Sequence, residues 1–206
     1  MSLFGERLAA APAGATATPL PTTLGGASVA IGGRAAPLFY AAPGQINAQV
    51  PYETPAGQTL VVVTVGGVAS APTPLNIVAA APGIFTFGTN RAVVQNEDFS
   101  VNDAGNPTGP GTTMVAYLTG GGGFNNPAVT GAPSPASPLV EVRGLPSSVT
   151  IGGQPAEILF LGLTPGLVGA LQANLRLPPW PTGNHPLVVT IGGVASNAPL
   201  ITVAGN

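Results

Sequence analysis

The sequence predicts an all-β chain made of two tandem β-sandwich domains. Short apolar runs alternate with polar residues, Gly-Gly pairs punctuate the runs, and a set of motifs occurs twice in the same order. Alternation with a period of two is typical of a strand with one buried face. A Gly-Gly pair suits the two positive-φ positions of a type I′ hairpin turn. No window keeps a helical period long enough to predict a helix.

The repeated motifs indicate a duplicated domain. SVAIGGRAA (28–36) matches SVTIGGQPA (148–156) at six of nine positions, and VVTVGGVAS (62–70) matches VVTIGGVAS (188–196) at eight of nine. The offset between the copies drifts from 120 to 126 residues, which indicates a small insertion in the second copy. Each Gly-Gly pair is predicted to close a tight hairpin.

Between the two motifs of each copy lies a further shared element. PGQINAQVP (43–51) corresponds to PGLVGALQANLRLP (165–178), and both alternate apolar with polar residues. We expect both copies to share one sandwich topology. In that topology Val63, Val65, Val189 and Ile191 face inward, whereas Thr64 and Thr190 face outward.

The domain boundary is expected near AAAPGIF (79–85), because Pro82-Gly83 breaks the strand that precedes it. Residues 1–82 then form the first domain and 83–206 the second. The second domain carries a Pro-rich loop at 125–146, predicted to be exposed because proline cannot pair inside a sheet.

The composition of the chain argues against several classes of function. Charged residues make up 6% of the chain, against roughly 25% in an ordinary soluble domain. The chain has five scattered Arg and no Lys, which argues against nucleic-acid binding. No apolar run reaches the roughly 20 residues of a membrane-spanning helix, so we expect no membrane insertion. The N-terminus lacks the pattern of a signal peptide, and the absence of Cys excludes disulfides and thiol chemistry.

Together these motifs resemble a known family. PLPTTLGGASVAIGGRAAPLFYAAPGQINAQVPYETPAG, VVVTVGGVAS, AAPGIF and VTIGGQPAEILFLGLTPGLVGALQANLRLP are similar to the Solibacter-type uncharacterised C-terminal domain family. Each half also resembles the IPT/TIG class of immunoglobulin-like domains. The resemblance implies immunoglobulin-like sandwiches in an exported bacterial protein, located outside the cell or on its surface. It carries over no catalytic residues. Members show a strand upstream of the segment that matches SLFGERL (2–8), and this chain starts at Met1 without it.

We expect no catalytic site and no cofactor. The one histidine, His185, stands in a turn setting and far in sequence from both aspartates, so a Ser-His-Asp arrangement is not indicated. One His without Cys also makes a zinc site improbable. QNEDFSVNDAGN (95–106) gathers oxygen donors, with Glu97, Asp98 and Asp103 as a weak calcium candidate. Turn formation by Asn, Asp and Gly is the favoured interpretation.

Two further segments are candidates. The run GGGG (120–123) lacks the Lys of a phosphate-binding loop and is interpreted as a flexible connection. Trp180, the only Trp, stands between prolines and is the candidate for ligand binding, since an exposed aromatic ring can stack on a sugar or anchor a protein contact. The favoured alternative is that Trp180 packs against the end of a sandwich or between the domains.

The leading functional hypothesis is a non-catalytic extracellular structural or adhesive module. The second domain has a preamble at 91–111 that the first lacks, so the first domain is expected to be completed by a strand from another chain or from upstream sequence. Strand addition between copies, or with other surface proteins, would build a surface fibre or filament. The alternative is an accessory module that binds carbohydrate or protein for a larger secreted protein.

Overall fold

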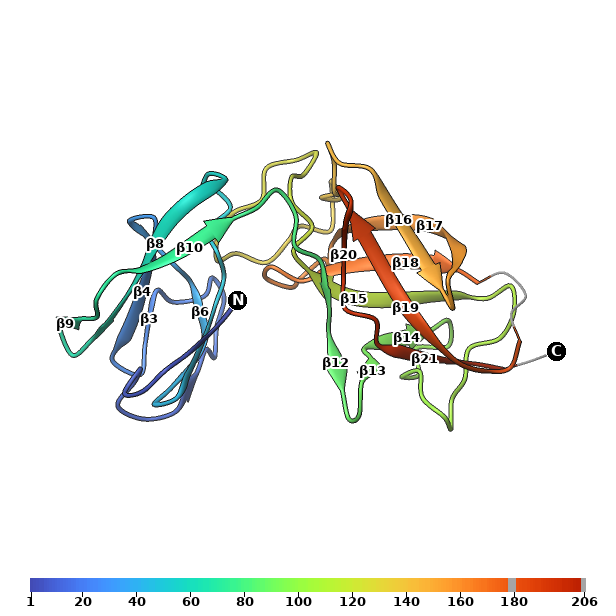
Figure 1. Ribbon diagram of the computed structural model, residues 1–206, viewed down its shortest axis with the longest axis horizontal. Coiled ribbons are helices and arrows are strands. Elements are labelled where there is room, and N and C mark those ends of the chain that lie inside the picture. Colours follow the sequence, from blue (N-terminus) through green and yellow to red (C-terminus); the bar gives the residue numbers. More distant parts are fainter. Residues whose placement is uncertain (178–180, 205–206) are drawn as a thin grey trace. The chain divides into compact units, whose positions relative to one another are not determined.

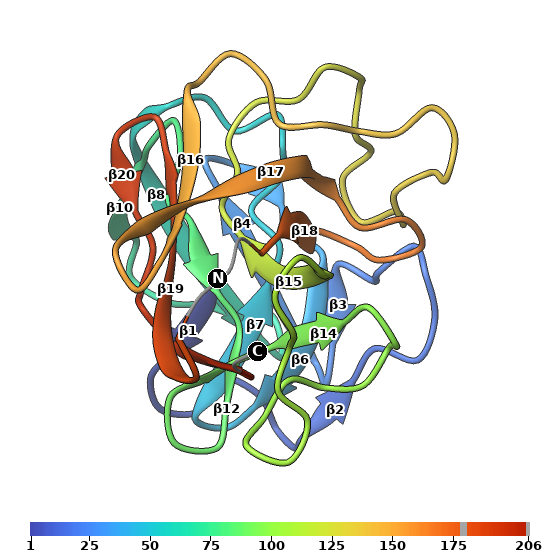
Figure 2. The ribbon, with the colours of Figure 1, turned by 90° about the vertical axis from the view of Figure 1, so that its right-hand side faces the viewer.

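The computed structural model describes residues 1–177 and 181–204, and these residues form strands and turns without any helix (Figures 1 and 2). The all-β prediction is confirmed: the chain builds several sheets, consistent with a β-sandwich. The chain divides into two compact units. Unit 1 comprises Met1–Val78, Ala128–Ala136 and Pro165–Gly169; unit 2 comprises Ala79–Pro127, Ser137–Thr164 and Ala170–Asn206.

Unit 1 contains two sheets. The first has the strand order β1-β7-β6-β2, and the second the order β10-β8-β4-β3, with β5 beside β4 and β9 beside β8. The strands are Ser2–Phe4 (β1), Ala13–Gly14 (β2), Thr23–Leu24 (β3), Ala27–Ile31 (β4), Arg34–Ala35 (β5), Leu38–Ala42 (β6), Gln45–Ala48 (β7), Gly57–Val65 (β8), Val68–Ala69 (β9) and Thr73–Ile77 (β10). The core contains the inward side chains of both sheets, including Ile31, Leu38 and Ile46, which are fully buried.

Unit 2 forms one continuous sheet of 11 strands. Its order is β11-β15-β18-β17-β16-β19-β21-β13-β12, with β14 beside β15 and β20 beside β19. The strands are Gly83–Ile84 (β11), Thr86–Phe87 (β12), Arg91–Ala92 (β13), Val94–Asn96 (β14), Thr113–Thr119 (β15), Ser147–Ile151 (β16), Gln154–Leu163 (β17), Leu171–Arg176 (β18), Gly183–Ile191 (β19), Val194–Ala195 (β20) and Leu200–Val203 (β21). Within the described residues, none of this forms a helix that could cross a membrane.

The repeated motifs adopt the same strand pairing in both units. β4 pairs with β8 as β16 pairs with β19, so that Val29 lies opposite Val63 and Val149 opposite Val189. Each pair is followed by a serine, Ser70 or Ser196, whose hydroxyl accepts the N–H of that strand's valine at 3.1 or 3.0 Å. The pairs β6–β7 and β17–β18 both contain a bulge at the matching position.

Unit 1 has two sheets where unit 2 has one, and the difference lies between β5 and β6. In unit 2 the long strand β17 pairs with β16 through its first residues and with β18 through the rest. The matching chain in unit 1 is interrupted between β5 and β6 at Pro37, where unit 2 has Glu157. Proline has no N–H to donate, but the Pro37 carbonyl still accepts the Gln49 N–H at 2.8 Å, so the backbone keeps a bond to the chain after β7.

The predicted hairpin turns are confirmed by their backbone. The glycines of all four predicted pairs have positive φ, from 58° to 83°. A fifth pair, Gly25-Gly26, has φ of 59° and 76° and closes the β3–β4 hairpin, which the sequence analysis did not identify.

The predicted strand register agrees with the burial pattern of unit 2. Val189 and Ile191 are fully buried, and Thr190 between them is only half-buried. In unit 1, Val63 and Val65 pack against the core, but Thr64 is half-buried as they are, so burial alone does not separate the two faces of β8 there.

The Pro-rich stretch is more ordered than an exposed loop. Its residues 128–136 belong to unit 1, where the Gly131 N–H donates to Oε1 of Gln49 at 2.7 Å and the Thr130 hydroxyl accepts the Tyr52 N–H at 3.0 Å. Gly131 and Ser134 are buried. Proline prevents regular pairing but does not prevent isolated backbone hydrogen bonds to a neighbouring surface.

Candidate functional site

The first strand of unit 1, β1, corresponds by register to strand β15 of unit 2. β1 pairs antiparallel with β7, with Phe4 opposite Gln45, and β15 pairs antiparallel with β18, with Tyr117 opposite Gln172 (Figure 2). The two glutamines are equivalent, since each donates its side-chain amide to an asparagine two residues later, at 2.8 and 2.9 Å. Phe4 therefore matches Tyr117, and Met1, Ser2 and Leu3 match Met114, Val115 and Ala116.

The outer edges of these two strands differ. The outer edge of β15 is covered by β14 and β11: the Tyr117 N–H donates to the Val93 carbonyl at 3.1 Å, and the Tyr117 carbonyl accepts the Phe85 N–H at 3.0 Å. On β1, Met1 and Gly5 direct their hydrogen bonds to β7. Because alternate residues of an antiparallel strand bond to opposite sides, Ser2 and Phe4 direct theirs outward. No described residue pairs with these outward groups of Ser2 and Phe4.

The side chains of β1 are also less buried than the equivalent side chains of β15. The inward residues of β15 are all fully buried, and Met114 is 0% exposed. At the equivalent position of β1, Met1 is 40% exposed, and Leu3 is only half-buried. On the face of the sheet that points away from the core, the Phe4 side chain is 76% exposed. The equivalent Tyr117 is half-buried and donates its hydroxyl to Gln95 of β14 at 3.2 Å. The edge of β1 thus leaves apolar side chains uncovered as well as backbone groups.

Other edges of unit 1 carry prolines. β10 contains Pro74 and follows Pro72, and β2 follows Pro12. A proline at a sheet edge removes a donor and discourages pairing with another chain. β1 contains neither proline nor a charged side chain, so neither of these two features prevents its edge from pairing with another strand.

The calcium candidate does not form a cluster. Oδ1 of Asp98 accepts the N–H and the hydroxyl of Ser100 at 3.0 and 2.6 Å, and these bonds, with the side-chain bond foremost, lower the pKa of Asp98. Oδ1 of Asp103 accepts the N–H groups of Gly105 and Asn106 at 2.7 and 2.9 Å. These are the self-bonded turns expected of Asp. Among the described residues no three His, Cys, Asp or Glu side chains lie in a group that could hold a metal ion. Glu97 and Asp98 line an open hollow of about 530 Å³.

The same segment supplies a buried polar network that the sequence analysis missed. Asn102 is 1% exposed; its amide group donates to Oδ1 of Asn96 and to the Thr202 carbonyl, and its Oδ1 accepts the Thr202 N–H. These bonds join the loop 95–106 to the last strand, β21. The spacing of Asn residues in the sequence does not distinguish such a buried role from a turn, because the partner is about 100 residues away.

The glycine run 120–123 is tightly packed, so its interpretation as a flexible connection is wrong. A Cβ on Gly120 would lie 1.9 Å from the Ala81 carbonyl oxygen, and one on Gly122 would lie 2.4 Å from that of Ala79. A Cβ on Gly121 would lie 2.3 Å from Leu171. Glycine is required here because the backbone of residues 79–81 passes too close for any side chain.

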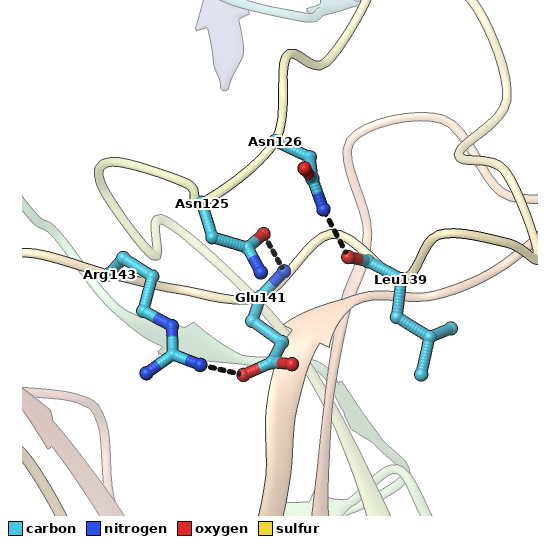
Figure 3. Close-up of polar contacts among 5 residues, drawn as sticks. All are labelled: Asn125, Asn126, Leu139, Glu141 and Arg143. Carbon is cyan, nitrogen blue, oxygen red and sulfur yellow. Dashed lines mark hydrogen bonds and ion pairs between the residues drawn. The ribbon is translucent and has the colours of Figure 1, made fainter.

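A short extension after the glycine run lies antiparallel to residues 139–143 (Figure 3). Oδ1 of Asn125 accepts the Glu141 N–H, and the Asn126 side chain donates to the Leu139 carbonyl, each at 2.8 Å. Arg143 and Glu141 form an exposed ion pair at 2.7 Å beside an open hollow of about 360 Å³. Since the two charges neutralise each other, this hollow presents no free charge from the pair.

The remaining sequence candidates give no catalytic arrangement. His185 lies on strand β19 opposite Ile201, so its predicted turn setting is wrong; its Nε2 lies 2.8 Å from the Pro181 carbonyl. Trp180 lies outside the described residues. A scan of the chain against protein-family models found no matching family, and a search of curated proteins found no relative.

Proposed function

We propose that the chain is a non-catalytic structural or adhesive module of an exported bacterial protein, built of two tandem immunoglobulin-like sandwiches. It joins other proteins of the cell surface, or further copies of itself, by accepting a β-strand at the outer edge of β1. The observation that supports this proposal is the difference between β1 and β15. The same chain has the same strand twice, once covered by neighbouring strands and once open.

Strand addition suits this edge for a physical reason. An open edge presents N–H and C=O groups in register for another extended chain, and natural proteins usually protect such edges. Here the outward groups belong to Ser2 and Phe4, and the exposed Phe4 ring lies beside them. An added strand would satisfy the backbone groups and cover apolar side chains in one step.

The carboxylates and the histidine support a structural role. Asp98 and Asp103 bond within their own turns, and His185 of β19 bonds to the nearby Pro181 carbonyl, so their polar atoms hold the fold locally. The buried amides of Asn96 and Asn102 bond to each other; Asn96 also donates to the Asn106 carbonyl, and Asn102 donates to the Thr202 carbonyl of β21. Such internally satisfied networks stabilise one conformation.

The test is a selection of binding peptides with the intact chain. A displayed library of random nonapeptides is selected against the ¹⁵N-labelled protein, and the binders are mapped by amide chemical shifts. We expect binders that shift the Ser2 and Phe4 resonances. Phe4→Pro, which removes one outward N–H but no bond to β7, should abolish their binding.

Phe4→Ala is the matched control, because it keeps the N–H and removes only the ring. It should retain most of the binding, and both variants should keep the chemical shifts of β6 and β7. Selected peptides that leave Ser2 and Phe4 unshifted, or that bind Phe4→Pro as well as the unmodified chain, would overturn the proposal.

A further inference from the structure

Strand β14 of unit 2 covers the outer edge of β15, the strand that corresponds to β1. Resting on the proposed function, we propose that the partner of β1 is a short antiparallel strand with the side-chain pattern of β14. The pattern places a β-branched apolar residue opposite Leu3 and a long polar residue opposite Ser2.

The register follows from the matched strands. In unit 2, Val94 lies opposite Ala116 and Gln95 opposite Val115. Since Leu3 and Ser2 match Ala116 and Val115, a strand that repeats this pairing places its Val94 equivalent opposite Leu3. Its Gln95 equivalent then lies opposite Ser2, where the outward N–H and C=O groups of β1 can exchange hydrogen bonds.

The inward position needs an apolar side chain. Val94 is 1% exposed in unit 2 and helps to cover the buried side of β15. Leu3 packs against the core of unit 1 but is only half-buried. A β-branched residue opposite Leu3 would complete its burial, and such residues also favour the strand conformation.

The outward position needs a long side chain that can lie along an aromatic ring. In unit 2, Oε1 of Gln95 accepts the hydroxyl of Tyr117, the residue diagonally across from it. Phe4 stands at the Tyr117 position and has no hydroxyl, so the methylene groups of a Gln-like side chain would cover the ring while its amide remains in water.

The strand can be short because unit 1 already covers the next position. In unit 2, β11 places Ile84 opposite Leu118. The matching residue of β1 is Gly5, and a Cβ there would lie 3.3 Å from the Leu8 side chain. Leu8 therefore takes the space beside Gly5, and the added strand needs only to pair along Met1–Phe4.

The experiment uses two peptides of the same composition with the intact ¹⁵N-labelled chain. One peptide, AVVQNED, copies residues 92–98, and the other, AVQVNED, exchanges the residues at the Val94 and Gln95 positions. Exchange turns the apolar side chain away from the core and the polar one toward it. We expect AVVQNED to shift the Ser2 and Phe4 amides and to bind at least about tenfold more tightly than AVQVNED, as a difference of about 1.4 kcal/mol would give.

Equal binding of the two peptides would overturn the proposed pattern, as would shifts away from β1. Self-association of the chain through β1 that AVVQNED does not compete with would show a second copy as the occupant and would also overturn it. Should the library yield β1 binders that lack this pattern, the strand-addition function stands and the pattern of the partner is wrong. A library without any β1 binder removes the function itself.

Discussion

Single asparagine side chains form several of the internal hydrogen bonds of unit 2. Asn197 bonds to both the N–H and the carbonyl of Ile84, at 2.7 and 3.0 Å, as a strand neighbour would. Asn102 does the same for Thr202. A side-chain amide can replace a backbone partner because it offers one donor and one acceptor in similar geometry. These residues therefore join segments that no regular strand pairing joins.

Replacing Asn102 should be costly. Asn102→Leu leaves the Thr202 N–H and Oδ1 of Asn96 without these partners, whereas the Thr202 carbonyl keeps the Thr108 N–H. We expect the free energy of unfolding to fall by about 2–4 kcal/mol. Urea unfolding followed by fluorescence or circular dichroism measures the change. Asn76→Leu is the control, since Asn76 is exposed on β10. A loss for Asn102→Leu no larger than the control's would show that the network contributes little.

The glycine run separates two causes of glycine dependence. Gly120 and Gly144 have nearly the same φ, 79° and 83°, but only Gly120 lies against backbone. Gly144→Ala should cost about 1 kcal/mol from the left-handed conformation alone. Gly120→Ala adds a clash with the Ala81 carbonyl, so we expect a further loss of at least about 2 kcal/mol or a failure to fold. Equal losses in thermal unfolding would contradict the close approach.

A hydrogen bond between Thr130 and Glu53 connects the loop 128–136 to the first segment of unit 1. Oε2 of Glu53 accepts the Thr130 hydroxyl at 2.8 Å. The pKa of Glu53 is lowered, first by a hydrogen bond from its own backbone and then by this bond. A lowered carboxyl pKa stabilises the fold above the unfolded pKa, about 4.3, and this stabilisation is lost as the pH falls through the folded value.

We therefore expect the urea midpoint to fall between pH 5 and pH 3 as Glu53 is protonated. Thr130→Val should be less stable at both values, since the Tyr52 N–H also loses its acceptor, but its fall with acid should be smaller. The difference is small because Glu53 is exposed. An identical acid dependence in Thr130→Val and the unmodified chain would show that the bond does not bias the titration.

The sequence predicts those elements whose information is local. The hairpins at the Gly-Gly pairs and the inward valines follow from positive-φ requirements and period-two alternation, which act within a few residues. The glycine run was misinterpreted because its constraint comes from residues 79–81, which no local pattern connects to it. The division of β5 from β6 has no counterpart in β17, although both repeats contain a proline in this segment, Pro37 and Pro155. From the sequence, the open edge of β1 could be inferred only from the missing counterpart of residues 91–111. The register that matches β1 to β15 comes from their pairing with β7 and β18 in the structure.

Unit 1 is not one continuous stretch of the chain but consists of three segments. The sequence places a boundary at residue 82, but 128–136 and 165–169 group with the first segment. Gly131 carries the connection: its N–H donates to Gln49, and its carbonyl accepts the Leu20 N–H at 2.8 Å. Both bonds cover groups that an isolated first half would leave without these partners, and Gln49 is buried.

A fragment of residues 1–82 should therefore fold poorly. Without Gly131, Oε1 of Gln49 and the N–H of Leu20 exchange these two bonds for water, at a net loss of about 0.5–1.5 kcal/mol for each bond. The two losses together are an appreciable part of the 5–15 kcal/mol that typically stabilises a domain, and a small domain lies near the lower limit. We expect amide exchange in β6 and β7 to be much faster in the fragment than in the intact chain. A peptide copying residues 127–137, added to the fragment, should slow the exchange, because it returns the Gly131 bonds by mass action. A fragment whose β6 and β7 amides are protected as well as in the intact chain, without the peptide, would show that residues 1–82 fold independently of the later segments.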